Sequence, residues 1–165
     1  MSLRSFARLL SCFIASAFAF AAETARPPNI VLIIADDLGF GDAACYGGKG
    51  VDTPHIDRLA ARGLRFTQAY APSSTCTPSR YALMTGEYGW RQPPKQTAIL
   101  DGDAPAAIAS DTFTLPRLLQ RAGYATALIG KWHLGLGDGR TPVDFNAVIK
   151  PGPLEIGFDS AFFIP

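Results

Sequence analysis

A continuous apolar run at residues 29–35 constrains the fold of this chain more than any other segment. It reads Asn-Ile-Val-Leu-Ile-Ile-Ala, is rich in β-branched side chains and shows no alternation of polar with apolar residues. Such a run is typical of a strand that is buried on both faces, as strands are in a parallel sheet covered by helices. We therefore expect a buried strand at residues 29–35.

The segments that follow alternate between helical and extended patterns. Residues 53–63 begin with Thr-Pro, repeat apolar side chains at helical spacing and end in glycine, which predicts a helix. Residues 64–70 alternate in polarity and predict a second strand. The other predicted elements are a helix at residues 114–122 and strands at residues 124–129 and 158–162.

This order of elements predicts an α/β fold, with a mostly parallel sheet flanked by helices. In such folds ligands bind outside the carboxyl ends of the strands. Asp36 and Asp37 directly follow the first predicted strand, and Cys76 lies shortly after the second. Lys131 and His133 follow the third. We therefore expect these reactive side chains to converge at one edge of the sheet.

Cys76 lies at the start of a further predicted helix. Pro78 suits the first position of a helix, Thr77 is the expected N-cap, and Gly86 is the expected C-terminal stop. Cys76 would then precede a helix N-terminus, where free N–H groups and the helix dipole favour anions. Arg80 follows one turn along the helix.

The adjacent pair Asp36 and Asp37 suggests a metal site. Two neighbouring carboxylates repel each other unless a cation or several hydrogen-bond donors lie between them, and hard divalent cations take such oxygen ligands. The spacing does not fit an EF-hand loop, because the third loop position would be Leu38. A solvated strand end, with one aspartate capping the loop, is the alternative interpretation.

Residues 1–21 have the pattern of a secretory signal peptide. Arg4 and Arg8 precede an apolar run at residues 9–20, and small residues suit cleavage after Ala21. The apolar run is shorter than the roughly 20 residues that span a bilayer. We therefore expect an exported protein, periplasmic, extracellular or lumenal, without a stable membrane anchor.

Net charge and cysteine content limit the kinds of partner and of domain that the chain is expected to have. The formal net charge is +1 and the basic residues form no stripe, which argues against a nucleic-acid partner. Beyond the signal peptide two cysteines remain, Cys45 and Cys76. In an oxidising compartment they would be able to form a disulfide, which would make this a non-catalytic exported domain.

Taken together, these segments resemble the type I, formylglycine-dependent sulfatases, which are arylsulfatase-like enzymes of the alkaline phosphatase superfamily. Residues 28–37 resemble the first strand of that family with its metal-binding pair, and residues 53–60 resemble the helix that follows. Residues 76–86 resemble the first sulfatase motif, and residues 123–133 look like the second. Both motifs occur in order behind the Asp-Asp pair, which makes the resemblance specific.

The resemblance implies a calcium ion and a modified residue. Asp36 and Asp37 would bind calcium, and Cys76 would be a third metal ligand after its oxidation to formylglycine. A formylglycine-generating or sulfatase-maturing enzyme is therefore an implied partner. In the family the hydrated aldehyde is the nucleophile that attacks sulfur, and it is regenerated when sulfate leaves.

The resemblance also implies roles for three basic residues. Arg80 and His133 would hold and polarise the hydrate, and Lys131 would contact the sulfate. The implied activity is hydrolysis of sulfate esters of a small molecule or a glycan. A phosphonate or phosphate ester hydrolase of the same superfamily is the alternative within this resemblance.

This chain departs from the family in length. Members of the family are typically much longer, and their other calcium ligands, a second histidine and a second lysine lie beyond the second motif. We therefore expect residues 22–165 to be the N-terminal portion of a catalytic domain, with little or no activity alone.

Overall fold

The structure is a computed structural model that describes residues 26–91 and 98–165. It divides into two units, Met1–Asp37 and Leu38–Pro165. The predicted signal peptide at residues 1–21 lies outside the described residues. Within the described ranges, no helix combines the length and the apolar character that crossing a membrane requires.

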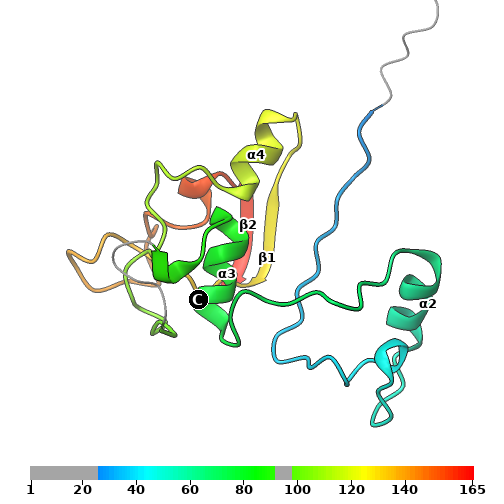
Figure 1. The fold of residues 1–165 in the computed structure, drawn as a ribbon. Helices are drawn as coiled ribbons and strands as arrows, with labels where there is room; N and C mark the ends of the chain where they lie inside the picture. Colours follow the sequence, from blue (N-terminus) through cyan, green and yellow to red (C-terminus); the bar gives the residue numbers. More distant parts are fainter. Residues whose placement is uncertain (1–25, 92–97) are drawn as a thin grey trace, which may run out of the picture. The chain divides into compact units, whose positions relative to one another are not determined.

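The helices and strands that the structure describes lie in the second unit (Figure 1). Strands β1 (Ala127–Lys131) and β2 (Ser160–Ile164) pair in parallel, with Ala127 opposite Ser160 and Lys131 opposite Ile164. This parallel pair with its helices confirms the predicted α/β class. The helices are α2 (Pro54–Arg62), α3 (Cys76–Thr85) and α4 (Leu115–Arg121), and the short 3-10 helices are η1 (Ala44–Tyr46), η2 (Gly89–Arg91) and η3 (Leu154–Ile156).

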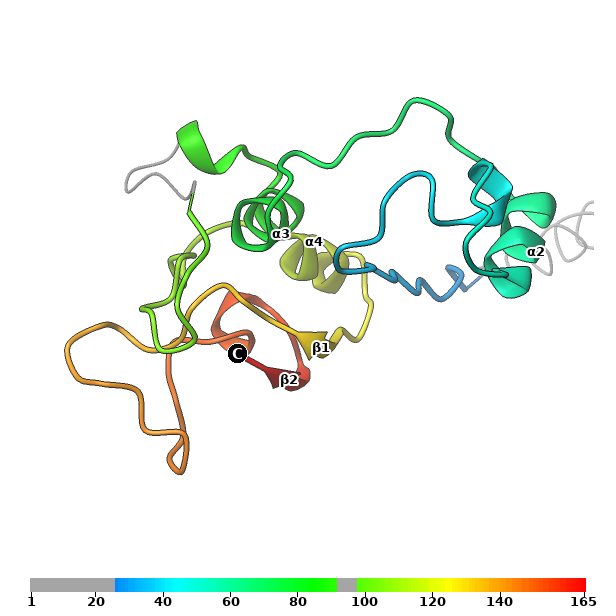
Figure 2. The ribbon, with the colours of Figure 1, turned by 90° about the horizontal axis from the view of Figure 1, so that it is seen from below.

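The core of the second unit lies between the strand pair and helix α3. Figure 2 shows α3 and α4 on one face of the β1–β2 pair. Leu128 and Phe163 pack against the core, whereas Ile129 is 79% exposed and Phe162 is 83% exposed. This alternation follows from the two-residue period of a strand. The buried core residues are Tyr81, Met84, Ile108, Trp132, Leu134, Leu136 and Ile156.

Helix α2 confirms the prediction for residues 53–63 and is tied to η1. Pro54 begins the helix, and the Thr53 hydroxyl accepts the Ala44 N–H at 2.8 Å and donates to Asp57 at 3.1 Å. Asp57 also accepts the Cys45 N–H at 2.7 Å. Asp57, on the first turn of α2, therefore anchors η1 to the start of this helix.

Helix α3 begins two residues earlier than Pro78, the first helical residue that the sequence predicted. Its first residue is Cys76, and its N-cap position is Thr75 rather than Thr77. Pro78 still fits, because the N–H groups of the first turn have no partner within the helix. Gly86 ends the helix with a φ of 73°, as expected for a left-handed C-cap.

Two predicted strands are wrong. Residues 29–35, in the first unit, and residues 64–70, in the second, are not in strands, and most of their apolar side chains are exposed. A strand forms only when a neighbour accepts and donates its backbone hydrogen bonds. In the described part of the chain, β1 and β2 pair only with each other. A sequence pattern indicates that a segment favours strand pairing, but the strand forms only where a second segment pairs with it.

The other predicted elements are present with shifted ends. Helix α4 lies within the predicted residues 114–122, whereas β1 begins at Ala127 instead of residue 124. The Tyr124 N–H donates to Leu119 O at 3.1 Å and so closes the helix instead of joining the sheet. Strand β2 likewise begins at Ser160 rather than residue 158, because the Phe158 N–H donates to Pro153 O at 3.3 Å.

Asp159 joins the two strands just before their pairing begins. Its Oδ2 accepts the Thr126 N–H at 2.6 Å, and its Oδ1 accepts from the Gln120 side chain at 2.7 Å. These hydrogen bonds, with a further one from the Thr126 hydroxyl, hold the pKa of Asp159 below its ordinary value. The carboxylate form therefore stabilises the fold.

We expect acid to remove this stabilisation. Because the folded pKa is lowered, the contribution is present above the unfolded pKa and is lost as the pH falls through the folded pKa. The Asp159→Asn variant should therefore lose less stability than the wild type between about pH 5 and about pH 2 in urea titrations. Asp103→Asn, at an exposed aspartate, is the matched control. Equal pH dependence of the wild type and Asp159→Asn would contradict the prediction.

Candidate active site

Cys76 and Lys131 meet where α3 begins and β1 ends. Cys76 is the first residue of α3, Lys131 is the last residue of β1, and both are half-buried. The Lys131 Nζ donates to the Cys76 Sγ at 3.4 Å. An ammonium group and a helix N-terminus both favour negative charge at residue 76.

Arg80 holds the end of β1 against α3. It lies one turn after Cys76, and its Nη1 donates to the backbone oxygen of Lys131 at 2.6 Å. A hydrogen bond from a charged donor is stronger than a neutral one. Arg80 therefore fixes the backbone from which the Lys131 side chain extends, and it adds a second positive charge near residue 76.

His133 follows β1 in a left-handed backbone conformation, with a φ of 54°. Its ring Nε2 lies 2.8 Å from the backbone oxygen of Leu100. Its Nδ1 is buried and has no hydrogen-bond partner among residues 26–91 and 98–165. The preceding Trp132 is buried and fixed by hydrogen bonds from its backbone N–H to Ile164 O and from its ring to Gly135 O.

Thr77 is a site residue that the sequence analysis did not identify. It is 0% exposed. Its hydroxyl donates to His133 O at 3.0 Å and accepts the Leu100 N–H at 3.2 Å. The sequence signal, a threonine beside a proline, indicated an N-cap, and no local pattern indicates these two distant partners.

Asp36 and Asp37 are exposed and belong to the first unit. Asp37 has a φ of 58°, a conformation that aspartate tolerates better than most residues. The two carboxylates fit calcium by donor type, but they offer at most four oxygens where calcium takes six to eight. Within the described ranges, no three His, Cys, Asp or Glu residues are grouped to hold a metal. The calcium pair therefore stays a prediction.

Cys45 and Cys76 are not joined by a disulfide in the structure, which therefore gives no support to that pairing. The backbone of Cys45 is engaged locally, because its N–H donates to Asp57 and its carbonyl accepts from Arg65. Cys76 instead contacts Lys131 through its sulfur. The two cysteines thus lie in different surroundings.

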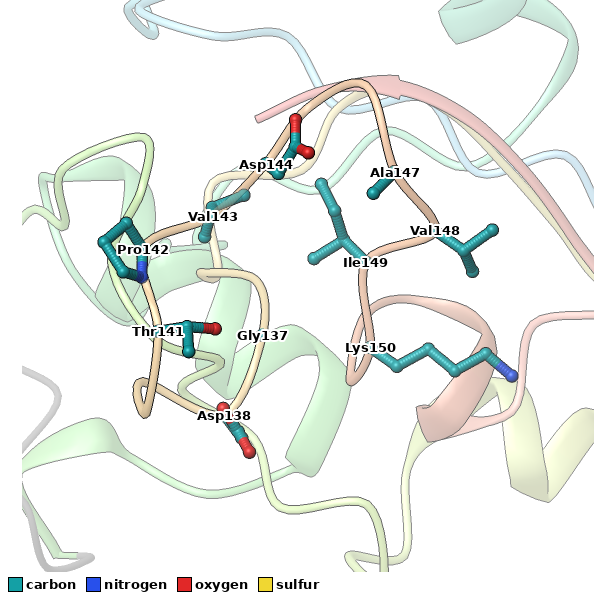
Figure 3. A pocket seen from close by; sticks show the side chains of 10 residues that line it. All are labelled: Gly137, Asp138, Thr141, Pro142, Val143, Asp144, Ala147, Val148, Ile149 and Lys150. Atoms are coloured by element: carbon teal, nitrogen blue, oxygen red, sulfur yellow. The ribbon is translucent and has the colours of Figure 1, made fainter.

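A pocket of about 180 Å³ lies within the loop at residues 137–150 (Figure 3). Three of its polar side chains are engaged with neighbours: Asp138 pairs with Arg140, Asp144 accepts from the Asn146 backbone at 2.9 Å, and Lys150 pairs with Glu155. The pocket shares no lining residue with the Cys76 region. We assign it no chemistry.

The fold and the charges around residue 76 define an α/β protein suited to binding an anionic group at a helix N-terminus. The Sulfatase family model matches residues 28–163, and the chain belongs to the sulfatase family. This confirms the family predicted from the two motifs and the Asp-Asp pair.

Similar proteins include enzymes with different substrates. The chain is 51% identical to an N-acetylgalactosamine-6-O-sulfatase of Bacteroides thetaiotaomicron, over 87% of this chain and 27% of that protein. It is 43% identical to the steryl-sulfatase of Mus musculus, over 96% of this chain and 25% of that protein. The chain thus spans about a quarter of the length of these relatives.

A solved structure agrees with the match in sequence. It was described under the metabolism of multiple glycosaminoglycans by Bacteroides thetaiotaomicron and superposes with a TM-score of 0.80 at 51% identity. The superposition covers 86% of this chain and 29% of that one. At 51% identity the two proteins are close relatives, and they share more than a general fold.

Proposed function

We propose that this protein hydrolyses sulfate esters and that Cys76 is the precursor of its formylglycine nucleophile. The observation that carries the proposal is the 3.4 Å contact between Lys131 Nζ and Cys76 Sγ at the start of α3. Membership of the sulfatase family supports the reaction class. The contact supports Cys76 over Cys45 as the reactive residue, because the Lys131 ammonium donates to the Cys76 sulfur, whereas Arg65 donates to the backbone oxygen of Cys45.

The residues around Cys76 have distinct tasks in this proposal. Lys131 binds the anionic group at residue 76 and stabilises the charge on its oxygens. Arg80 keeps the Lys131 backbone in place through its 2.6 Å hydrogen bond. His133, fixed through Nε2, presents Nδ1 to the reacting group. Formylglycine, when formed, supplies a nucleophile that divides the reaction into two easier steps.

Calcium fits the carboxylate pair in donor type, and Asp36 and Asp37 would supply part of its ligands. When bound, it would neutralise charge on the sulfuryl oxygens. Asp36 and Asp37 would fill only part of its coordination sphere, so ligands from elsewhere in the protein are required.

We propose a sulfated glycan as the substrate. The N-acetylgalactosamine-6-O-sulfatase is more similar to this chain than the steryl-sulfatase is, at 51% against 43% identity. The protein purified from its own host should hydrolyse a 6-O-sulfated amino sugar faster than a steryl sulfate. Faster hydrolysis of phosphate or phosphonate esters than of any sulfate ester would overturn the proposed reaction.

We also propose that the protein is exported to a periplasmic, extracellular or lumenal compartment and is modified by a formylglycine-forming enzyme. The basic and apolar pattern of residues 1–21 supports export. The residues Cys76 to Arg80, Cys-Thr-Pro-Ser-Arg, support modification at Cys76.

A mass spectrum of the tryptic peptide at residues 66–80, from protein made in its own host, tests the proposal. This peptide contains Cys76 as its only cysteine. Formylglycine at residue 76 is the expected result. A fully alkylatable cysteine, or a disulfide between Cys45 and Cys76, would overturn the proposed nucleophile.

A further inference from the structure

We propose that Thr77 is a positioning residue that fixes the imidazole ring of His133 in one orientation and one tautomer. The effect on catalysis rests on the proposed sulfatase function. The orientation and tautomer of the His133 imidazole do not depend on that function. Thr77 follows Cys76 in α3, and 56 positions separate it in sequence from His133.

Three hydrogen bonds link Thr77, Leu100 and His133 in a closed network, and two of them involve the Thr77 hydroxyl. The hydroxyl donates to His133 O at 3.0 Å and accepts the Leu100 N–H at 3.2 Å. The Leu100 carbonyl oxygen in turn lies 2.8 Å from the His133 Nε2. One buried hydroxyl thus holds both the backbone of His133 and the residue that contacts its ring.

The partner of Nε2 determines the tautomer. A carbonyl oxygen only accepts hydrogen bonds, so Nε2 must carry the proton that it donates to Leu100 O. In the neutral ring Nδ1 then carries a lone pair. Nδ1 is buried and has no partner in the described part of the chain, so no described residue occupies this lone pair.

The backbone of His133 also has external restraints. Its φ of 54° lies in the left-handed region, which histidine adopts more readily than most non-glycine residues do. Such conformations persist where the surrounding structure holds them. The hydrogen bond from the Thr77 hydroxyl to His133 O is one such restraint, and Trp132, buried immediately before, is another.

Nitrogen NMR of the imidazole rings tests the geometry directly on this chain. The chain has two histidines, and His55, exposed in the first turn of α2, is an internal control. At about pH 8, above the ordinary imidazole pKa, His133 should show protonated Nε2 and unprotonated Nδ1. A wild-type His133 ring protonated on Nδ1 would overturn the proposal without any variant.

Two variants distinguish the effect of the Thr77 hydroxyl from the effect of the shape of its side chain. Thr77→Val removes the hydroxyl and keeps the branched shape, so the His133 signals should become a mixture of tautomers. Thr77→Ser keeps the hydroxyl and should retain the wild-type signals. The His55 signals should not move in either variant. If Thr77→Val does not fold, Thr77→Ala replaces it, and a single retained tautomer in a hydroxyl-free variant overturns the proposal.

A kinetic experiment tests the effect on catalysis. It uses protein from its own host, and the rates are normalised to the formylglycine content of the peptide at residues 66–80. Thr77→Val should lower kcat by roughly 10²-fold, the scale of a small misplacement of a catalytic group, with little change in KM. Thr77→Ser should restore most of kcat. An unchanged kcat in Thr77→Val, with formylglycine present, would overturn the positioning role. A shifted tautomer in a protein without sulfatase activity would instead overturn only the proposed function.

Discussion

The Cys76→Ala variant should lose sulfate-ester hydrolysis by roughly 10⁴-fold or more, because removing a nucleophile has effects of this size. Alanine has no sulfur from which the aldehyde can be made, and it also removes the acceptor of the hydrogen bond from Lys131 Nζ. The measurement is kcat/KM with a 6-O-sulfated amino sugar, using protein purified from its own host. The peptide at residues 66–80 should carry no formylglycine.

Cys45→Ala is the matched control for this variant. Both cysteines are half-buried, and the substitution is the same. The hydrogen bonds of Cys45 with Asp57 and Arg65 use its backbone, so alanine retains them. We expect near wild-type activity from Cys45→Ala. A Cys76→Ala protein with wild-type activity would show that another residue is the nucleophile.

The Lys131→Ala variant should lower kcat/KM by about 10²- to 10³-fold, the scale of removing one donor that stabilises developing charge. The Lys131 Nζ lies 3.4 Å from the Cys76 sulfur, so its charge acts where the sulfuryl group would bind. The backbone oxygen that accepts from Arg80 is retained in alanine. The loss should therefore come from the missing ammonium and not from displacement of β1.

Lys150→Ala is the control for a lost lysine charge. Lys150 is exposed and forms an ion pair with Glu155 at 3.4 Å. An exposed pair of this kind contributes about 0–1 kcal/mol to stability. Its removal should leave kcat/KM within about threefold of the wild type, which corresponds to less than 1 kcal/mol. Equal losses from Lys131→Ala and Lys150→Ala would contradict a specific role for Lys131.

The helices were predictable because their signals are local. Thr-Pro at residues 53–54 and glycine at residue 63 lie within one short segment that becomes α2, and the same holds for α4. Strands depend on a partner that the local pattern does not contain. Residues 29–35 carry a strong strand pattern and are not in a strand, whereas the predicted strand at residues 124–129 begins three residues later, at Ala127.

The sequence by itself determined the family and the candidate chemistry, because residue types at a fixed spacing, Cys76 with Arg80 and Lys131 with His133, are written in the chain. Only the tertiary structure decided how these residues meet. The contact of Lys131 with Cys76 spans 55 positions, and the hydrogen bond from Thr77 to His133 O spans 56. Such contacts depend on packing between α3 and the end of β1, and no local pattern encodes that geometry.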